Sequence, residues 1–504
     1  MPSDPATSQT RRRLNKDECI ELSIDSLAHG GAGVGRTDGF VVFARGGLPG
    51  DHVVAQVTMG KKRFAEARVM EVTKPGPDRV PERAPHPGAA WQCLHYDAQL
   101  KEKTRQVRDS LERLGGFAFA AESEGAPVLE PIIAAGVDHA DPAIWNYRNK
   151  VEFSFGTREA EAGGGLALGF HSPGKWDVIE DVDDIVLSSE RANAIRRMVR
   201  DWCEERNLSP YDREEQFGFL RNLVVREGLR TGDTMVQLVT TNAEPQPEGF
   251  DSAGFVATLN TLDPPPTSVV WSRSDDPGNA ARGVKNKRLS GKSYIEEEVL
   301  GLRFRISPDA FFQTNSTQTE KLYATAIEFA GLTGHETVFD LYCGSGTIGI
   351  VMAEHAKQVW GIELVESAVA DAEVNANLNG VTNSEFIAGD MRLALPALIE
   401  QAGTPDVVVL DPPRPGLSSK VVRRVLDAAP KRIVYVSCNP TTLAPNLKQL
   451  AESGYALRRV RPVDMFPHTP HIECVAIMDL VDDAKRLAVI EQRRAEKRLP
   501  RNPA

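Results

Sequence analysis

The sequence predicts an α/β protein in three successive parts, the last of which is a doubly wound parallel sheet. Short period-two strands with Gly-rich turns open the chain, a mixed α+β region follows a Pro-rich linker, and helices alternate with apolar strands from about residue 317. A chain of 504 residues is also too long for a single hydrophobic core, so we expect two or three domains.

Residues 14–73 are expected to form an OB-like β-barrel of five short strands. Apolar residues recur at every second position, and glycine-rich turns separate the stretches. The stretches span residues 20–24, 40–43, 52–57 and 67–72. We interpret residues 30–35 (GGAGVG) as a turn rather than a phosphate loop, because no helix follows them.

Residues 74–300 are expected to form a central α+β domain that begins with a Pro-rich linker. A helix is predicted over residues 91–115. Part of its apolar stripe is formed by Leu100, Val107, Leu111 and Leu114. The expected strands span residues 151–155, 166–170, 220–226 and 235–240, with a helix near 189–206.

Residues 301–482 are expected to form the doubly wound domain. Its candidate strands span residues 337–341, 358–362, 384–388, 407–410 and 432–437, and its helices span 346–356, 365–379 and 418–428. Ligands of such sheets bind beyond the carboxyl ends of the strands. Residues 483–504 are expected to be a basic tail, because seven Lys or Arg stand against two acids from Lys485 onward.

Composition and charge narrow the classes of function. The net charge of −11 argues against a protein that coats nucleic acid by bulk electrostatics, although basic clusters at 11–13, 61–63 and 285–288 can still contact phosphates locally. We expect a cytoplasmic protein, since the chain has neither an apolar run of ~18 residues nor the apolar region of a secretory signal. Six scattered cysteines without a CxxC pair exclude a disulfide framework and a closed zinc site.

A glycine-rich loop and acidic strand ends predict a nucleoside cofactor. Residues 344–349 (GSGTIG) satisfy G-x-G-x-x-G between a strand and a helix, and Glu363 ends the next strand, where a carboxylate can accept both ribose hydroxyls. These features fit NAD and S-adenosylmethionine alike. Asp340, just before the glycines, favours S-adenosylmethionine, because a carboxylate there can face a sulfonium or amino group. The acidic turn 411–414 (DPPR) at the end of the fourth strand favours it as well, because such a Pro-held turn is typical of nucleic-acid methyltransferases.

Cys438 is the candidate nucleophile. It follows an apolar strand at the ligand edge of the sheet, whereas a lone cysteine elsewhere is more often inert and buried. Cys343, inside the glycine loop, is interpreted as a small residue that fits there, and the other four cysteines as inert.

Three downstream residues, His468, His471 and Glu473, allow two interpretations. They could be metal ligands, but Pro470 breaks helical spacing and no further ligand cluster is evident, so we expect no metal. Glu473 is better interpreted as a positioned base.

Five motifs follow one another in the C-terminal half: FQTN at 312–315, DLYCGSGTIG at 340–349, DPPR at 411–414, SCNP at 437–440 and FPHTPHIE at 466–473. Together and in this order they resemble the motifs of the RNA uracil-5-methyltransferase family. Segment 14–73 resembles a TRAM domain, and YRNK at 147–150 resembles the opening of the family's central domain. The resemblance covers nearly the whole chain. It implies a class I methyltransferase fold, S-adenosyl-L-methionine as cofactor, and a monomer that acts on RNA. The TRAM segment favours the 23S rRNA-type branch over the tRNA branch.

The chemistry of uracil methylation calls for the same residues. Uracil C5 is a weak nucleophile until a thiolate adds at C6, and a base must later remove the C5 proton so that the thiolate can leave. Cys438 is the expected nucleophile and Glu473 the expected base. The resemblance implies that the S-adenosylmethionine contacts are Gln313, Tyr342, Glu363 and Asp411. The target base is expected to leave its stack or to lie in a loop.

The sequence departs from the family at two places. Many ribosomal members carry four cysteines for an iron–sulfur cluster, three of them just after the TRAM segment, but residues 85–93 hold only Cys93, so no cluster is expected. Residues 444–447 (APNL) stand where the family usually has an Arg-Asp pair.

Other interpretations stay open at this point. The chain could be a class I methyltransferase that acts on tRNA uridine, on another RNA base or on protein, or a non-catalytic RNA-binding assembly factor with a vestigial methyltransferase fold. An oxidoreductase would explain the glycine loop but neither Cys438 nor the DPPR turn.

Overall fold

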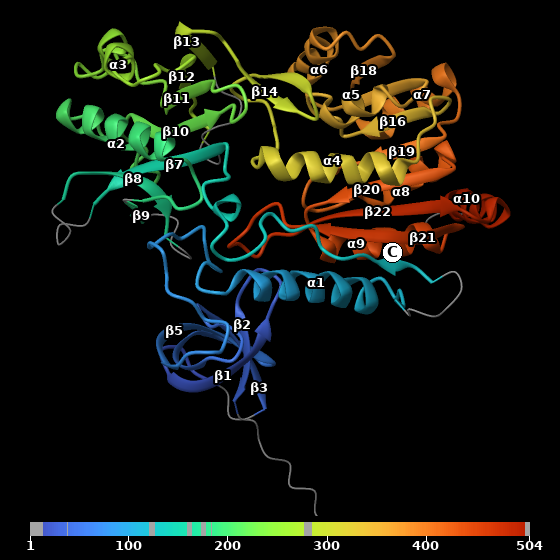
Figure 1. The fold of residues 1–504 in the computed structure, drawn as a ribbon, viewed down its shortest axis with the longest axis horizontal. Coiled ribbons are helices and arrows are strands. Elements are labelled where there is room, and N and C mark those ends of the chain that lie inside the picture. Colours follow the sequence, from blue (N-terminus) through green and yellow to red (C-terminus); the bar gives the residue numbers. More distant parts are fainter. Residues whose placement is uncertain are drawn as a thin grey trace, which may run out of the picture.

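The computed structural model describes residues 14–37, 39–119, 126–158, 164–172, 178–182, 184–276 and 285–498. A small barrel, a central sheet and a larger sheet with helices on both faces follow one another along the chain (Figure 1). The basic cluster 11–13 and the chain end 499–504 lie outside the described residues. None of the described helices is both long and apolar enough to cross a membrane.

The N-terminal barrel has five strands, as the sequence predicts. It closes in the order β1-β2-β3-β5-β4. Its strands are β1 (Cys19–Leu27), β2 (Gly33–Thr37), β3 (Phe40–Arg45), β4 (His52–Gly60) and β5 (Phe64–Lys74). The interpretation of all of 30–35 as a turn was wrong, because β2 begins at Gly33. A Cβ at Gly33 would lie 2.6 Å from the carbonyl oxygen of Gly47, so the glycine permits close strand packing there.

Helix α1 (Tyr96–Arg113) joins the barrel to the large sheet. Val107 and Leu111 are fully buried in the core of that sheet, where the helix packs on α9 (Pro440–Ala451). Leu114 follows the helix and is 47% exposed, so its predicted place in the apolar stripe was wrong.

The chain that follows α1 also joins the large sheet, through a short strand. β6 (Val128–Leu129) pairs in parallel with β21 (Tyr455–Val463) and forms the last strand of the sheet. Part of the segment assigned by sequence to a central domain at 74–300 therefore packs on the C-terminal sheet.

The central region is a seven-stranded sheet in the order β13-β12-β11-β10-β7-β8-β9. Helices α2 (Glu190–Glu205) and α3 (Ser252–Leu259) contribute to the apolar core that covers one face. The strands are β7 (Lys150–Thr157), β8 (Leu166–His171), β9 (Ile179–Glu180), β10 (Leu220–Glu227), β11 (Thr234–Thr240), β12 (Ser268–Arg273) and β13 (Lys285–Gly291). The short helix η1 (Pro142–Ile144) precedes them, and the hairpin of β14 (Ile295–Val299) and β15 (Leu302–Ile306) follows.

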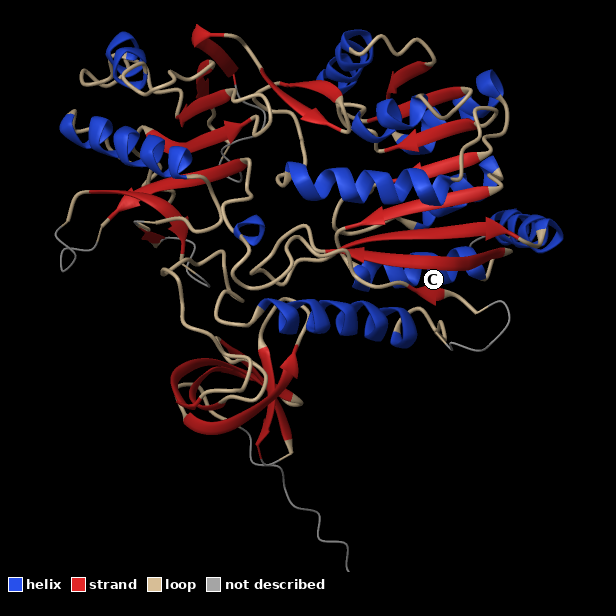
Figure 2. Cartoon of the chain, viewed as in Figure 1, coloured by secondary structure: helices blue, strands red, loops and turns tan. Residues whose placement is uncertain are grey.

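The large sheet has the order β18-β17-β16-β19-β20-β22-β21-β6, which confirms the predicted doubly wound fold. Strands β18 to β20 are parallel, and β22 inserts antiparallel beside β20. The further strands are β16 (Thr337–Leu341), β17 (Gln358–Glu363), β18 (Ser384–Ala388), β19 (Val407–Leu410), β20 (Arg432–Ser437) and β22 (Glu473–Leu480). The helices are α4 (Ser316–Ala330), α5 (Thr347–Ala353), α6 (Glu366–Leu378), α7 (Met391–Ala402) and α8 (Ser419–Ala428). Helices cover both faces of this sheet (Figure 2).

The segment predicted as a basic tail at 483–504 begins as a packed helix, which corrects that expectation. Helix α10 (Asp483–Arg498) contacts α8. Ile490 is buried in the core of the large sheet, and the Arg486 guanidinium donates to the carbonyl oxygen of Leu426 at 2.8 Å. The first turns of this segment are therefore part of the fold.

Candidate active site

The strand ends of the large sheet bring the predicted site residues to one edge. Since β16, β17, β19 and β20 are parallel, their carboxyl ends meet there. Those ends carry, in the order of the sequence, Tyr342, Glu363, Asp411 and Cys438. The edge faces the central sheet in Figure 1.

Cys438 and Glu473 approach each other through the antiparallel pairing of β20 and β22. Ser437, the last residue of β20, pairs with Cys474. The next pair along this register is Cys438 with Glu473, the first residue of β22. The predicted nucleophile and the predicted base therefore stand opposite each other, although 35 positions separate them in the sequence.

The surroundings of both groups disfavour their charged forms. Burial raises the pKa of the half-buried Cys438 thiol to about 11, and the nearby carboxyl groups of Glu473 and Asp411 add to the effect. Burial also raises the pKa of Glu473 well above its usual range, with a further contribution from Asp411. The guanidinium of Arg414 opposes both shifts.

Two more carboxyl groups complete an acidic cluster that suits a cationic ligand. Burial raises the pKa of Asp340 and of Asp411 to about 7, and the charge of Asp411 contributes to the shift at Asp340. Asp340 Oδ2 accepts the N–H of Gly349 at 2.9 Å, but its buried Oδ1 has no hydrogen-bond partner among the described residues. A ligand with sulfonium and amino groups, as in S-adenosylmethionine, would supply the missing partner and charge.

A cavity of about 570 Å³ lies beside this cluster and has the size and polarity for a nucleoside. Tyr342 and Glu363 line it together with the exposed apolar side chain of Leu364. Glu363 is held by the backbone N–H groups of residues 344, 364 and 365, at 3.2, 2.7 and 3.0 Å. Tyr342 adopts a left-handed backbone conformation with φ 70°, which is uncommon outside glycine and often marks a functional site.

Asp390 also lines this cavity, and sequence reasoning missed it. It follows β18 closely, caps α7 and pairs with Arg392 at 2.5 Å. A carboxylate just after a candidate strand was the signal that could have found it.

Gln313 lies apart from that cavity. It is buried in the loop before α4, where its backbone carbonyl oxygen accepts a hydrogen bond from the side-chain amide of Asn149 at 3.0 Å. The same amide donates to Ser316 at 2.9 Å, and the backbone N–H of Asn149 donates to the carbonyl oxygen of Thr314. The YRNK motif thus holds the FQTN motif in place, a role that sequence reasoning did not assign.

A buried ion pair seats the loop that leads into Glu473. Lys103 of α1 contacts Asp464 at 2.5 Å with both side chains fully buried, and it also donates to the carbonyl oxygen of Phe466. The hydroxyl of Tyr96 donates to the second oxygen of Asp464 at 2.7 Å. Burial lowers the pKa of Lys103, whereas the charge of Asp464 opposes the change. Residues 464–472, called the catalytic loop below, are thereby fixed to α1.

Replacing Lys103 by Met should destabilise the protein strongly, because Asp464 would stay buried without its cation. Loss of one partner of a buried pair costs about 3–5 kcal/mol. We expect this drop in the free energy of unfolding in urea titrations of Lys103→Met. Lys101→Met, at an exposed position of the same helix, is the control and should change it by less than about 0.5 kcal/mol. A drop below about 1 kcal/mol for Lys103→Met would show that the pair does not seat the loop.

His468 supports the catalytic loop by packing. Its ring stacks on Trp145 with centroids 3.7 Å apart, and its Nδ1 lies 3.0 Å from the amide nitrogen of Gln99. Burial lowers the pKa of His468 to about 3, so the ring is neutral. Within the described residues, no group of three or more His, Cys, Asp or Glu could hold a metal ion, so the metal interpretation of His468, His471 and Glu473 gains no support.

The segment 85–93 does not fit a four-thiolate cluster, because Cys93 is its one thiol. Ala89 and Trp91 are buried instead, and the backbone N–H of Trp91 donates to the carbonyl oxygen of His468 at 2.9 Å. This segment therefore supports the catalytic loop through packing and a backbone hydrogen bond.

Comparison with known families agrees with this architecture. Residues 280–480 match the family described as tRNA (Uracil-5-)-methyltransferase. Residues 15–70 match the TRAM domain, which coincides with the five-stranded barrel.

Similar proteins match over almost the full chain. An uncharacterized RNA methyltransferase of Halalkalibacterium halodurans is 38% identical and covers 94% of this chain and 99% of its own length. Another, from Chlorobaculum tepidum, is 39% identical over 94% of this chain and 98% of its own length.

A solved structure shares the fold. The tRNA (uracil-54, C5)-methyltransferase of Pyrococcus abyssi, in complex with S-adenosyl-L-homocysteine, superposes with a TM-score of 0.69 at 29% identity. The match covers 91% of this chain and all of that one. The chain therefore belongs to the RNA uracil-5-methyltransferase family and is an S-adenosylmethionine-dependent RNA (uracil-5-)-methyltransferase.

Proposed function

We propose that this enzyme makes 5-methyluridine through a covalent bond between Cys438 and C6 of the target uracil. The observation that carries the proposal is the register of β20 and β22, which sets Cys438 opposite Glu473. Cys438 is half-buried, so its thiol proton can leave to solvent before the thiolate adds to C6. Electron density then moves to C5. Bound S-adenosylmethionine supplies the electrophilic methyl group that C5 takes up.

Glu473 completes the reaction as the base. Its carboxylate removes the proton from C5, the C5–C6 double bond re-forms, and the bond from C6 to Cys438 breaks to release the thiolate. Glu473 must be ionised for this step. A positive charge bound beside Asp340 and Asp411 favours the ionised form of every carboxyl group in the cluster.

The cofactor contacts follow from the same geometry. We infer that Glu363 accepts the ribose hydroxyls, that Tyr342 borders the nucleoside, and that Asp411 faces the sulfonium end. Their places around the 570 Å³ cavity and the acidic cluster support these roles. Gln313 is proposed as a contact on the resemblance of the FQTN motif alone.

S-adenosylmethionine should bind more tightly as the pH rises through about 7. Below that pH, Asp340 and Asp411 are largely protonated and neutral, and above it they are ionised and attract the cation. Binding at low pH therefore releases protons, and the affinity rises by at most about tenfold per pH unit for each coupled carboxyl group. Calorimetry between pH 6 and pH 8, in two buffers of different ionisation enthalpy, would count these protons. An affinity that does not depend on pH would contradict the cation-binding role of the pair.

We propose ribosomal RNA as the substrate, supported by the TRAM barrel. Transfer RNA is the second candidate, because the similar Pyrococcus abyssi enzyme is a tRNA (uracil-54, C5)-methyltransferase. That match covers 91% of this chain and therefore reaches into residues 14–73, so the barrel does not exclude tRNA.

Nucleoside mass spectrometry of rRNA and tRNA fractions from host cells with and without the gene tests this proposal. Loss of 5-methyluridine from the rRNA fraction is the expected result. Loss from the tRNA fraction would replace rRNA by tRNA, and unchanged 5-methyluridine in both would contradict the proposal.

A further inference from the structure

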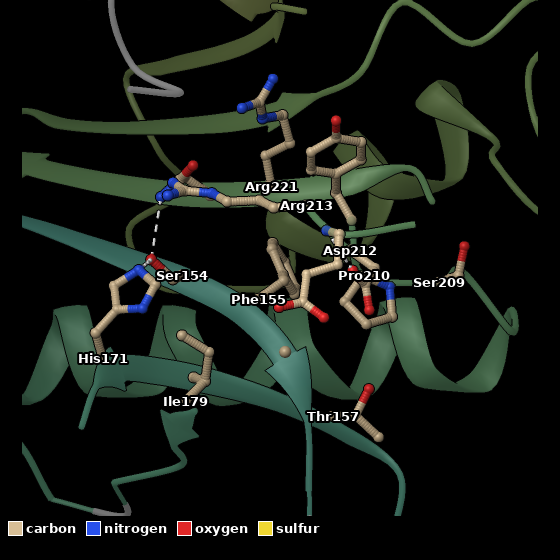
Figure 3. Close-up of a pocket in the computed structure, with 14 residues that line it drawn as sticks. Ser154, Phe155, Thr157, His171, Ile179, Ser209, Pro210, Asp212, Arg213 and Arg221 are labelled. Atoms are coloured by element: carbon tan, nitrogen blue, oxygen red, sulfur yellow. Dashed lines mark hydrogen bonds between the residues drawn. The ribbon is translucent and has the colours of Figure 1, made fainter. Parts of the chain in front are cut away.

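Two pockets adjoin along β7 of the central sheet, next to the candidate active site. The first, here called the inner pocket, has a volume of about 340 Å³, and its lining includes His86, Arg148, Lys150, Glu152, Phe170 and Thr314. The second, called the outer pocket and drawn in Figure 3, has about 520 Å³, and its lining includes Ser154, Thr157, His171, Tyr211, Arg213 and Arg221. Lys150 and Glu152 of β7 line the inner pocket, and Ser154, on the same face of that strand, lines the outer one.

The inner pocket contains a buried donor that lacks a partner. His86 is 9% exposed, and its Nδ1 accepts the backbone N–H of Gly88 at 2.9 Å. This places the proton of the neutral ring on Nε2, which is buried and has no hydrogen-bond partner among the described residues. Burial lowers the pKa of His86 to about 4, so the ring is neutral at pH 7. The hydroxyl of Thr314 is likewise buried without a described partner. Leaving such groups unpaired is costly, and a ligand with acceptor oxygens would satisfy them.

Cations beside these donors specify an anionic ligand. Arg148 and Lys150 line the same pocket and outnumber its one carboxylate, Glu152. The guanidinium of Arg148 lies 5.5 Å from the ring centre of Phe466, a residue of the catalytic loop. An RNA phosphodiester group combines negative charge with acceptor oxygens, and it would meet these groups close to Cys438 and Glu473.

The outer pocket offers flat side chains and polar edges. The guanidinium of Arg221 lies 4.8 Å from the ring centre of Tyr211 and is fixed by the carbonyl oxygens of Ser274 and Asp276 at 2.8 and 2.5 Å. Elsewhere in the lining, the hydroxyl oxygen of Ser154 and Nε2 of His171 lie 3.2 Å apart. Figure 3 shows the two arginines on one side of the pocket and His171 with Thr157 on the other. Aromatic and guanidinium planes with polar groups at their edges are the surroundings in which unstacked bases bind.

We propose that these pockets bind the RNA strand beside the target uridine, with a phosphodiester group in the inner pocket and a splayed nucleobase in the outer one. This inference rests on the proposed function, because it takes Cys438 and Glu473 as the place where the target base reacts. Arg148 lies two residues before β7, and six positions separate it from Ser154. An extended chain rises ~3.3 Å per residue, so the path along this segment is about 20 Å, a few nucleotides of extended RNA.

Binding of fluorescein-labelled oligouridine, as a trinucleotide and as a dodecanucleotide, tests the path by fluorescence anisotropy. In the wild-type protein the longer RNA should bind more tightly, because only it reaches both pockets. Tyr211→Ala should reduce this length advantage about fivefold or more through lost stacking. Lys150→Ala should reduce it too, and should lower the slope of log Kd against log salt by about 0.7. Arg213→Ala, at an exposed side chain, tests the outer pocket without disturbing the core.

Lys448→Ala is the matched control. Lys448 is exposed in the last turn of α9, at the end away from the candidate active site, and its replacement removes the same charge. It should keep both the length advantage and the salt slope. The inference is overturned if Lys150→Ala, Tyr211→Ala and Arg213→Ala all keep the wild-type advantage. Failure of the proposed function has a different signature, which is wild-type protein that forms no 5-methyluridine in any RNA.

Discussion

Cys438→Ala should abolish methyl transfer to RNA, with a loss of about 10⁴-fold or more. Without a thiolate at C6, C5 of uracil does not become nucleophilic enough to take up a methyl group, and no other cysteine stands opposite Glu473. The measurement is transfer of radiolabelled methyl groups from S-adenosylmethionine to RNA. The variant should still bind S-adenosylmethionine, because Cys438 does not line the 570 Å³ cavity.

Cys19→Ala is the matched control for this experiment. Cys19 is an exposed residue of β1 in the barrel, far along the chain from the strand ends, so its loss should leave the rate unchanged. Residual activity of more than a few per cent in Cys438→Ala would mean that the methyl group reaches its acceptor without a covalent adduct.

Glu473→Gln should trap the covalent complex between the enzyme and its RNA. Methyl transfer precedes proton removal, so the variant can form the bond from Cys438 to C6 and methylate C5, but it lacks the base that releases the thiolate. Loss of a positioned base slows turnover about 10²–10⁴-fold. Because burial already disfavours the charge on Glu473, the neutral amide should not destabilise the fold. Denaturing electrophoresis should show a shifted band that contains protein, RNA and methyl label.

The double variant Cys438→Ala/Glu473→Gln supplies the control for that band. It should show none, since the adduct needs the thiol. If Glu473→Gln alone gives no band while methyl transfer continues, another group removes the C5 proton and Glu473 is not the base.

Local patterns in the sequence suffice for much of the fold and for individual site residues. The barrel, the five parallel strands and the glycine loop can each be predicted from short stretches of sequence, because strand periodicity and turn glycines are local features. Strand β2 was not predicted, because its residues Gly33 and Gly35 are of the type that is common in turns. Helices α7 and α9 were not predicted either. Each contains an internal proline, Pro396 or Pro445, and proline in a sequence argues against the interior of a helix.

Long-range pairing is what the sequence does not specify locally. The position of Glu473 opposite Cys438 depends on β22 inserting antiparallel next to β20. The ion pair between Lys103 and Asp464 joins residues 361 positions apart. A single local signal pointed to it, because Lys103 interrupts the apolar face of a helix between Leu100 and Val107. A charge on a buried face requires a partner, but only the folded chain identifies which one.

RNA that contains 5-fluorouridine tests the covalent mechanism most directly. Fluorine replaces the proton that the base must remove, so the bond between Cys438 and C6 should persist after methyl transfer. The account predicts a stable complex in the presence of S-adenosylmethionine, and peptide mass spectrometry should place a methylated 5-fluorouridine on the peptide that contains Cys438. Absence of any complex, or attachment at a different cysteine, would contradict it.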